Sequence, residues 1–509
     1  MLPAGAKGLR YRRGNADGCP GPQGRMRPAR RVRPPCLPGW QTPDPVRERA
    51  RKALRRYHLG RKCIDTISYV ITLLFVLLII VQYFRNRPTL WLMLAYSLLS
   101  PYIVIAGAKY DGMYVGVLAL WLAVLVKNKG KLQKIKNVFF NHYFRMAVFV
   151  YGVYLVSWLV FNRTHTENLL IVYTGAMKAG LFMAACYVIN RKLPKAAIQG
   201  QVYWMIVFVV LCNAVFVFLQ RTNTSLGLEL IHTLQNGASY SYALQTTQWG
   251  VFSRCFGAMP YPMQLAIFTV FAHAFIISMK KKVLLKNTVM IVNLALGVFS
   301  ASKTFFIGII IVTAQQFLTL PYFAKTSKKT VWIGVVLLTL FGLAVWNYDW
   351  IYTFLDQNLG SNYARYWGFL SNREEIFSTR YSNDASYLSY MPEFLKQYWL
   401  MGVGPVSLND ERIIDSAFYV ILHNGGIIAL IPVVAFYLRY LAEGWRRRDQ
   451  FTFLIMTSIL MTGVGFQTWV LADPCVWPLA YLALSANADV RVRAGAAAGC
   501  RQRVAQTQL

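Results

Sequence analysis

The chain has 509 residues, of which 56% are hydrophobic, and it carries a formal net charge of +34. Apolar runs of about 17–25 residues, long enough to cross a bilayer as helices, recur along most of the sequence and exclude an ordinary soluble domain. The positive charge does not indicate nucleic acid, because Lys and Arg collect in the cytoplasmic loops of membrane proteins and no nucleic-acid-binding motif is present.

The first 62 residues differ in composition from the rest of the chain. They are rich in Arg, Pro and Gly and contain no apolar stretch. This composition predicts a disordered cytoplasmic tail and not a cleaved signal peptide, and it also fits an over-extended gene start. The eight cysteines of the chain include no CxxC pair. They predict neither a disulfide framework nor a metal site.

Residues 63–487 are expected to form the membrane domain. Lipid offers no water to backbone groups, so apolar segments cross it as helices. The predicted fold class is therefore all-α, a polytopic transmembrane bundle of about 12–13 spans with one large extracytoplasmic loop. Residues 488–509 are expected to be a short cytoplasmic tail. The spans are predicted at 64–84, 89–107, 111–126, 144–162, 168–189, 200–219, 258–279, 286–301, 304–321, 330–347, 414–438, 450–471 and 474–487.

Basic loops set the predicted orientation, since Lys and Arg favour the cytoplasmic side. The segments between these loops alternate to the outer face, among them 220–253, the corner at 300–303 and the long loop at 348–412. Upstream of residue 127 the number of candidate spans is odd. Either 89–126 contains one full span plus a re-entrant piece, or the N-terminal tail lies outside. We favour the first, because so basic a tail resists translocation. The loops assigned to the cytoplasm are 127–136, 191–195, 280–286, 325–329 and 439–448.

The loop at 348–412 is far longer than the others, and long loops in compact architectures tend to carry function. Near its end stand Gly402 and Gly404, which allow positive φ and the close approach of another group, and which predict a tight turn. Asp415 and Ser416 follow at the start of the next span. Asp415 is either a helix cap or a base that takes a proton from a sugar hydroxyl, and the two roles are compatible.

Four basic residues are predicted at the outer face, where the positive-inside rule disfavours them. These are Arg254, Lys303, Arg373 and Arg380. Cations kept at such places indicate function. Their natural partner is a phosphate, which Arg binds bidentately and Lys binds as a point charge. The alternative for Arg254 and Lys303 is a contact with a lipid headgroup, and Arg373, beside two glutamates, is equally well a solvated loop charge.

Three local patterns carry a resemblance to a known family. The first is Arg-Cys-Phe-Gly at 254–257 followed by prolines, the second is Ser-Ala-Ser-Lys at 300–303, and the third runs from Arg380 through Gly-Val-Gly at 402–404 to the polar pair at 415–416 and a glycine pair. In this order they resemble the motifs of the O-antigen polymerase and O-antigen ligase superfamily. Its members are membrane glycosyltransferases that use undecaprenyl-diphosphate-linked sugars.

The resemblance implies roles for the candidate residues. Arg254 and Lys303 would bind the diphosphate of the lipid donor, and Arg380 would hold the donor or the sugar chain at the catalytic centre. Asp415 is the candidate for orienting or deprotonating the acceptor hydroxyl. Because basic residues carry the charge of the leaving group, the implied reaction needs neither metal nor cofactor. The further substrate-binding candidates are Arg373, Gly402, Gly404 and Ser416.

Ligases of this superfamily typically present a His near the end of the large loop. Here that position reads Asp415-Ser416, and His423 lies deeper in the following span. This departure favours a polymerase, which joins lipid-linked repeat units into O-antigen, capsule or exopolysaccharide at the outer face of a bacterial inner membrane. One alternative is a ligase that transfers glycan to lipid A core or protein. Another is a transporter or flippase of lipid-linked sugars, which usually shows two related halves.

The expected partners follow from the polymerase interpretation. They are a lipid-linked oligosaccharide substrate and membrane lipid, and a chain-length regulator protein is a further candidate. Nucleic acid is not expected.

Overall fold

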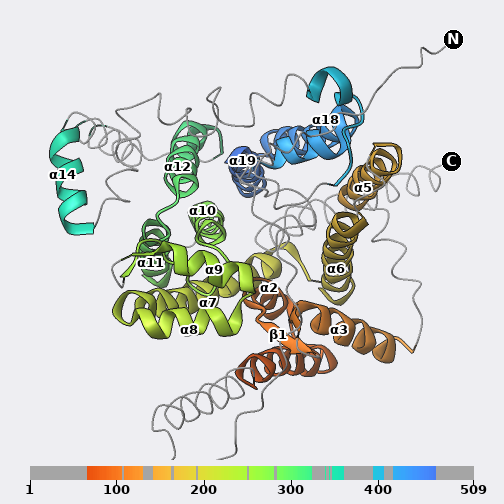
Figure 1. Cartoon of the computed structure of the whole chain (residues 1–509), viewed down its shortest axis with the longest axis horizontal. Helices are drawn as coiled ribbons and strands as arrows, with labels where there is room; N and C mark the ends of the chain where they lie inside the picture. The colour runs from red at the N-terminus through yellow and green to blue at the C-terminus, as the bar shows by residue number, and fades with distance from the viewer. Residues whose placement is uncertain are drawn as a thin grey trace, which may run out of the picture. The chain divides into compact units, whose positions relative to one another are not determined.

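The computed structural model describes the chain in part, and the described residues are mostly helical. Every element named below belongs to the unit Gly60–Leu509 (Figure 1). The predicted tails, 1–62 and 488–509, lie outside the described residues. The structure describes residues 66–105, 108–129, 142–161, 166–190, 193–248, 251–279, 284–323, 339, 343, 347–359, 394–405 and 416–465.

The described chain begins with the helix Thr66–Phe84. Next come the short helix α2 (Leu90–Leu99), the antiparallel hairpin β1 (Tyr102–Ile105) and β2 (Ala108–Asp111), and α3 (Met113–Lys127).

The prediction of one continuous span over 89–107 is wrong. Helix α2 ends after 10 residues, because Pro101 cannot supply the amide that a continuing helix needs. At 1.5 Å per residue α2 is only about 15 Å long, roughly half the hydrocarbon thickness of a bilayer. A short buried helix followed by a hairpin fits the interpretation of a re-entrant piece within 89–126.

The predicted outer segment 220–253 contains two helices and a small hairpin. Helix α7 (Lys195–Thr222) leads into α8 (Thr224–Leu234) and α9 (Gly237–Thr246), followed by β3 (Thr247–Gln248) and β4 (Val251–Phe252). An asparagine side chain begins each new helix. Asn223 accepts from the amide of Leu226 at 3.1 Å, and Asn236 accepts from the amide of Ser239 at 2.7 Å, which are N-cap bonds.

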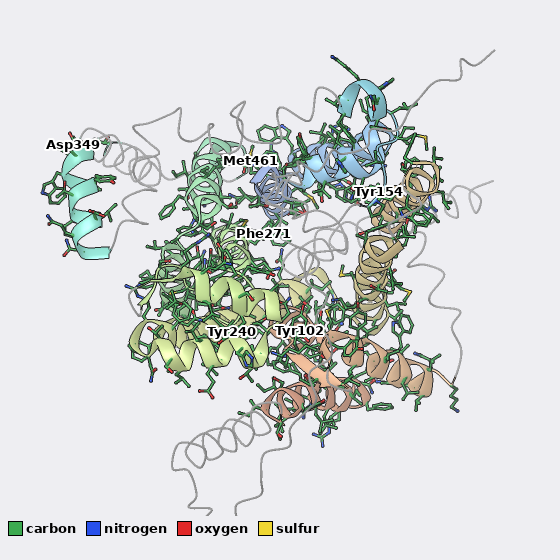
Figure 2. The ribbon with its side chains drawn as sticks, in the orientation of Figure 1. Tyr102, Tyr154, Tyr240, Phe271, Asp349 and Met461 are labelled. Atoms are coloured by element: carbon green, nitrogen blue, oxygen red, sulfur yellow. The ribbon has the colours of Figure 1, made fainter. Side chains whose placement is uncertain are left out.

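Helix α10 (Pro262–Ser278) lies at the centre of the helices in the second half of the chain. Residues 265–276 of this helix are all buried. Pro262 opens the helix, at a position where a missing backbone amide costs nothing. Phe271 is 1% exposed and lies among the crowded side chains of Figure 2. Helix α10 packs against α11, α12 and α19. The remaining helices are α5 (His142–Phe161), α6 (Thr166–Asn190), α10 (Pro262–Ser278), α11 (Leu284–Phe299), α12 (Lys303–Phe323), α14 (Tyr348–Leu359), α18 (Ala417–Arg446) and α19 (Gln450–Gly465).

Four of the described helices are long and apolar enough to cross a membrane by length and composition. Apolar side chains project outward on the first of them, where Leu73 is 68% exposed and Leu77 57% exposed. Several shorter apolar helices accompany them. Most of the predicted span at 330–347 and all of the one at 474–487 lie outside the described residues. The four long helices are Thr66–Phe84, Val172–Asn190, Ala197–Thr222 and Ala417–Arg446.

Candidate functional site

The structure describes only some of the predicted site residues. Arg373, Arg380 and Asp415 lie outside the described residues, so their roles stay predictions. Lys303 is described by its backbone position alone, as the first residue of α12. The fully described candidates are Arg254, Gly402, Gly404 and Ser416.

The loop that carries Arg254 is fixed by two buried side chains of α7. The side-chain oxygen of Gln220 accepts from the amides of Phe256 and Gly257 at 2.9 and 3.1 Å, and its amide nitrogen donates to the Gly257 carbonyl at 3.0 Å. Asn213 accepts from the amide of Ala258 at 2.9 Å. Because buried backbone groups must be paired, these bonds fix the path of the loop.

Gly257 gives the Arg-Cys-Phe-Gly pattern a physical reason. Its φ is +61°, a left-handed value that residues with a Cβ adopt only at a cost. A Cβ built there would lie 2.2 Å from the side-chain oxygen of Asn213. Both the backbone conformation and the closeness of the Asn213 side chain therefore require a glycine at this position.

The Arg254 loop lies directly against the turn between α11 and α12. The amide of Cys255 donates to the Phe299 carbonyl at 2.9 Å, and Nε of Arg254 lies 3.4 Å from the Ser300 carbonyl oxygen. Nη1 of Arg254 donates to the hydroxyl of Tyr242 at 2.7 Å. We call the paired segments 253–258 and 299–303 the cation corner. It joins two of the predicted motifs, although the Arg254–Ser300 contact spans 46 residues of sequence.

The turn within the cation corner is tight. Ala301 has a φ of 46°, which is unusual for a residue with a side chain and costs about 1–2 kcal/mol. Lys303 then opens α12, at the end of the helix that carries partial positive charge. A cation at that end is unfavourable for the helix but favourable for binding an anion, because exposed amides and the lysine charge attract the same group.

The described surroundings do not neutralise the charge of Arg254. Its described partners are a phenol and a carbonyl, both uncharged. The ion pairs found among the described residues join Lys178 to Asp111 and Arg447 to Glu443. Arg254 is half-buried, so its guanidinium keeps a positive charge on a partly shielded surface.

Arg221 is a further cation beside the cation corner and was not among the residues predicted from the sequence. Its Nη1 donates to the Phe252 carbonyl at 3.0 Å, and its guanidinium lies 5.6 Å from the centre of the Phe299 ring. A signal for it was present, because an arginine at the predicted outer end of a span breaks the same topological bias as Arg254 does. Burial raises the pKa of the Cys255 thiol to about 12, and the nearby charge of Arg221 opposes that rise.

Gly402 and Gly404 belong to a different structure, in which a short segment completes a broken helix. Helix α18 is interrupted at Gly426, where φ is 61° and ψ is −163°. The amide of Ile427 donates to the Trp399 carbonyl at 2.9 Å, and the amide of Gly404 donates to the Asn424 carbonyl at 3.0 Å. The segment thus pairs backbone groups that the break would leave open. We call residues 399–404 and 423–428 the glycine clasp.

Both glycines of the pair have positive φ, +68° at Gly402 and +84° at Gly404. A Cβ on Gly402 would lie 2.4 Å from the His423 carbonyl oxygen, and a Cβ on Gly404 would lie 2.6 Å from the Cα of Trp158. The close approach expected of a Gly-x-Gly pattern is therefore present, and the approached groups are backbone atoms of α18 and α5. A role of these glycines in binding substrate stays a prediction.

Ser416 and His423 complete the description of this end of the chain. The Ser416 hydroxyl donates to the Gly463 carbonyl at 3.3 Å, which ties the start of α18 to α19. His423 is 8% exposed, and its ring stacks on Phe394 with the centres 4.7 Å apart. Ser416 and His423 therefore make structural contacts. The sequence alone could not distinguish such contacts from a catalytic role.

Within the described ranges, no three His, Cys, Asp or Glu side chains gather so as to hold a metal ion. The basic side chains of the cation corner suit an anionic group. Comparison with known protein families finds none that matches the chain, and no curated protein matches it either. The superfamily resemblance therefore depends on the residue patterns and on the placement of these cations.

Proposed function

We propose that the chain is a membrane glycosyltransferase that polymerises undecaprenyl-diphosphate-linked repeat units into surface polysaccharide. The observation that supports this most is the contact of Arg254 with the Ser300 carbonyl, 3.4 Å long, which brings the two cationic motifs to one corner. A diphosphate needs more than one positive group. Arg254 lies against the turn that precedes Lys303, and Arg221 contacts Phe252 and Phe299 beside it, which supports their joint role.

The proposed reaction is a displacement at the anomeric carbon. A hydroxyl of the acceptor unit forms the new glycosidic bond while the bond to the lipid diphosphate breaks, and the bonding electron pair leaves with the diphosphate. The hydroxyl proton passes to a base, for which Asp415 is the candidate. Arg254 and Lys303, aided by Arg380, stabilise the charge on the departing oxygen, and a group in this role is worth about 10²–10³-fold in rate.

The proposed setting is the inner membrane of a bacterium, with the cation corner at its outer face. Four helices are long and apolar enough to cross a bilayer, which supports a membrane location. The full count of about 12–13 spans and the periplasmic assignment of 348–412 are parts of the proposal. Cations gathered at one corner favour group transfer, whereas a transporter spreads them along a path through both leaflets.

Deleting the gene and separating the surface glycan on a gel tests the proposal. A polymerase predicts that long chains disappear and single-repeat chains remain. Unmodified core together with accumulated lipid-linked polymer would instead identify a ligase. An unchanged glycan in the deletion strain would refute both.

A further inference from the structure

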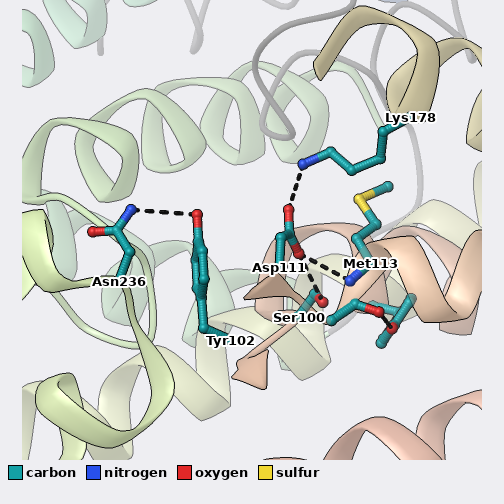
Figure 3. Close-up of polar contacts among 8 residues, drawn as sticks. Ser100, Tyr102, Asp111, Met113, Lys178 and Asn236 are labelled. Carbon is teal, nitrogen blue, oxygen red and sulfur yellow. Dashed lines mark hydrogen bonds and ion pairs between the residues drawn. The ribbon is translucent and has the colours of Figure 1, made fainter. Parts of the chain in front are cut away.

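A second polar group lies on the β1–β2 hairpin, away from the motifs that suggested the function. Tyr102 and Asp111 are directly paired across the two strands, so their side chains lie on the same face. The carboxylate of Asp111 forms an ion pair with Lys178 of α6, and Figure 3 shows the two charged groups facing each other. Residues far apart in sequence therefore meet beside the hairpin.

Asp111 is held firmly in place. Its Oδ1 accepts from the amide of Met113 at 2.9 Å and from the hydroxyl of Ser100 at 3.3 Å, while Oδ2 faces Lys178 (Figure 3). The amino group of Lys178 also lies 4.9 Å from the centre of the Tyr114 ring. Lys178 belongs to a helix apolar enough to span a membrane, where a charged residue is costly and points to function.

Tyr102 adds a neutral hydroxyl to this group. It accepts from the side-chain amide of Asn236 at 3.3 Å (Figure 3). Burial, with a smaller contribution from the charge of Asp111, raises its pKa to about 12, and the hydrogen bond from Asn236 opposes that rise. The phenol therefore stays protonated at physiological pH and remains able to donate a hydrogen bond.

Further tyrosine side chains lie near this group and near the cation corner. The ring of Tyr261 lies 6.1 Å from the ring of Tyr242. Tyr261 acts on Tyr102 electrostatically, and the Tyr242 hydroxyl accepts from Arg254. The side chains of both groups are half-buried, namely Lys178, Asp111, Tyr114, Tyr102, Tyr261, Tyr242 and Arg254.

We propose that Asp111, Lys178 and the tyrosines 102, 114 and 261 bind the saccharide of the lipid-linked substrate, while the cation corner binds its diphosphate. This inference rests on the proposed function. A sugar ring presents an apolar face and a rim of hydroxyls, and tyrosine offers a flat ring with a polar tip. The carboxylate and the ammonium each keep hydrogen-bonding capacity beyond their own pair, which suits neighbouring hydroxyl groups.

The competing explanation is that Asp111 and Lys178 only hold the hairpin to α6. A paired variant separates the two, because replacing both partners of a buried pair by neutral groups is often harmless to folding. In Asp111→Asn/Lys178→Met, the asparagine oxygen still accepts from Met113 and Ser100, and no charge is left alone. A structural pair predicts normal glycan from this variant, and a saccharide site predicts defective glycan.

The test is complementation of the deletion strain, with the glycan separated by chain length. We expect Asp111→Asn/Lys178→Met to lower the amount of long chains at least tenfold while the protein accumulates normally. The matched control is Glu443→Gln/Arg447→Met, which removes the other described ion pair, at the end of α18, and leaves chain length unchanged.

Long chains at the wild-type level in the Asp111→Asn/Lys178→Met strain would refute the saccharide site and leave the polymerase proposal standing. A deletion strain with unchanged glycan would refute the polymerase proposal and the saccharide site together. If the double variant fails to accumulate, Tyr261→Leu replaces it. Shortened chains from Tyr261→Leu support the site, and normal chains refute it.

Discussion

The cation corner and the glycine clasp are both irregular segments at the ends of apolar helices, but different forces hold them. In the cation corner, side chains of α7 pair with the loop backbone, as Gln220 does with two successive amides. In the glycine clasp, backbone pairs with backbone, as the Val403 amide does with the His423 carbonyl at 2.9 Å. The first leaves a guanidinium half-buried with neutral partners, and the second presents no charge at all.

This difference separates a glycine pair with a structural role from the arginine that we propose acts on the substrate. A Gly-x-Gly pattern next to a candidate site suggests a binding loop, yet here the amides of Val403 and Gly404 bond to the protein's own broken helix. Arg254 is more informative, because the protein fixes its loop firmly and still leaves the charge without a described carboxylate. Substitutions in the corner should therefore affect activity, and substitutions in the clasp should affect folding.

The largest expected effect is that of Arg254→Ala. Removing a positive group that stabilises a leaving anion costs about 10²–10³-fold in rate, so long glycan chains should disappear at normal protein levels. Lys303→Ala is expected to do the same. The measurement is glycan chain length in the complemented deletion strain, with immunoblots for protein level. Glycan chains of wild-type length in the Arg254→Ala strain would contradict the proposal that the cation corner acts on the substrate whereas the glycine clasp supports the fold.

The second effect concerns the stability of the clasp. In Gly404→Ala, a left-handed φ alone costs about 1–2 kcal/mol, and the contact with Trp158 adds to it. Thermal unfolding in detergent should show a clearly lower midpoint. Gly152→Ala is the matched control, because a Cβ there meets nothing within 4 Å inside helix α5, where alanine is favoured by about 1 kcal/mol. Equal midpoints for the two variants would contradict the proposed strain.

A third substitution tests whether the side chain of Gln220 holds the Arg254 loop in place. Gln220→Met leaves the amides of Phe256 and Gly257 without their acceptor, at about 1–3 kcal/mol for each unpaired buried group. We expect a lower unfolding midpoint together with shorter glycan chains, since the Arg254 loop loses its support. Gln82→Met is the control, because the buried side-chain oxygen of Gln82 has no hydrogen-bond partner among the described residues. Full activity and stability in Gln220→Met would show that the loop is fixed by other contacts.

The smallest effect is a chemical one at Cys255, which is fully buried in the corner. Burial raises the pKa of its thiol to about 12, so the reactive thiolate is scarce at neutral pH and increases only as pH approaches that value. In a variant whose other cysteines are serine, maleimide labelling at pH 7.5 should be slow until denaturant is added. Rapid labelling of the native protein would mean that the corner opens readily.

Hydropathy predicted most of the long helices well, because an apolar run of membrane length has few other solutions. Helix α10 was expected at 258–279 and occupies Pro262–Ser278, where a proline sets the start. The sequence did not predict α8 and α9, because the whole segment 220–253 was assigned to the outer face as a connection between spans, and the asparagine caps that begin both helices were not recognised. It also placed a continuous helix over 89–107, where Pro101 ends the helix and a hairpin follows.

The candidate site was predictable only where local rules apply. Arg254 stood out because its charge violated a topological bias, whereas Gly257 entered only as part of the pattern that resembles the superfamily. The partnership of Asp111 with Lys178 spans 67 residues, and that of Tyr102 with Asn236 spans 134. No periodicity or motif encodes such contacts, since they depend on how separate helices pack.

Binding of undecaprenyl diphosphate to the purified protein in lipid nanodiscs, measured by native mass spectrometry, tests the central claim most directly. The claim is that Arg254 binds the departing diphosphate, so we predict at least tenfold weaker binding to Arg254→Ala than to wild type. Undecaprenol, which lacks the diphosphate, should bind both proteins equally. Equal affinity of the two proteins for undecaprenyl diphosphate would contradict the claim.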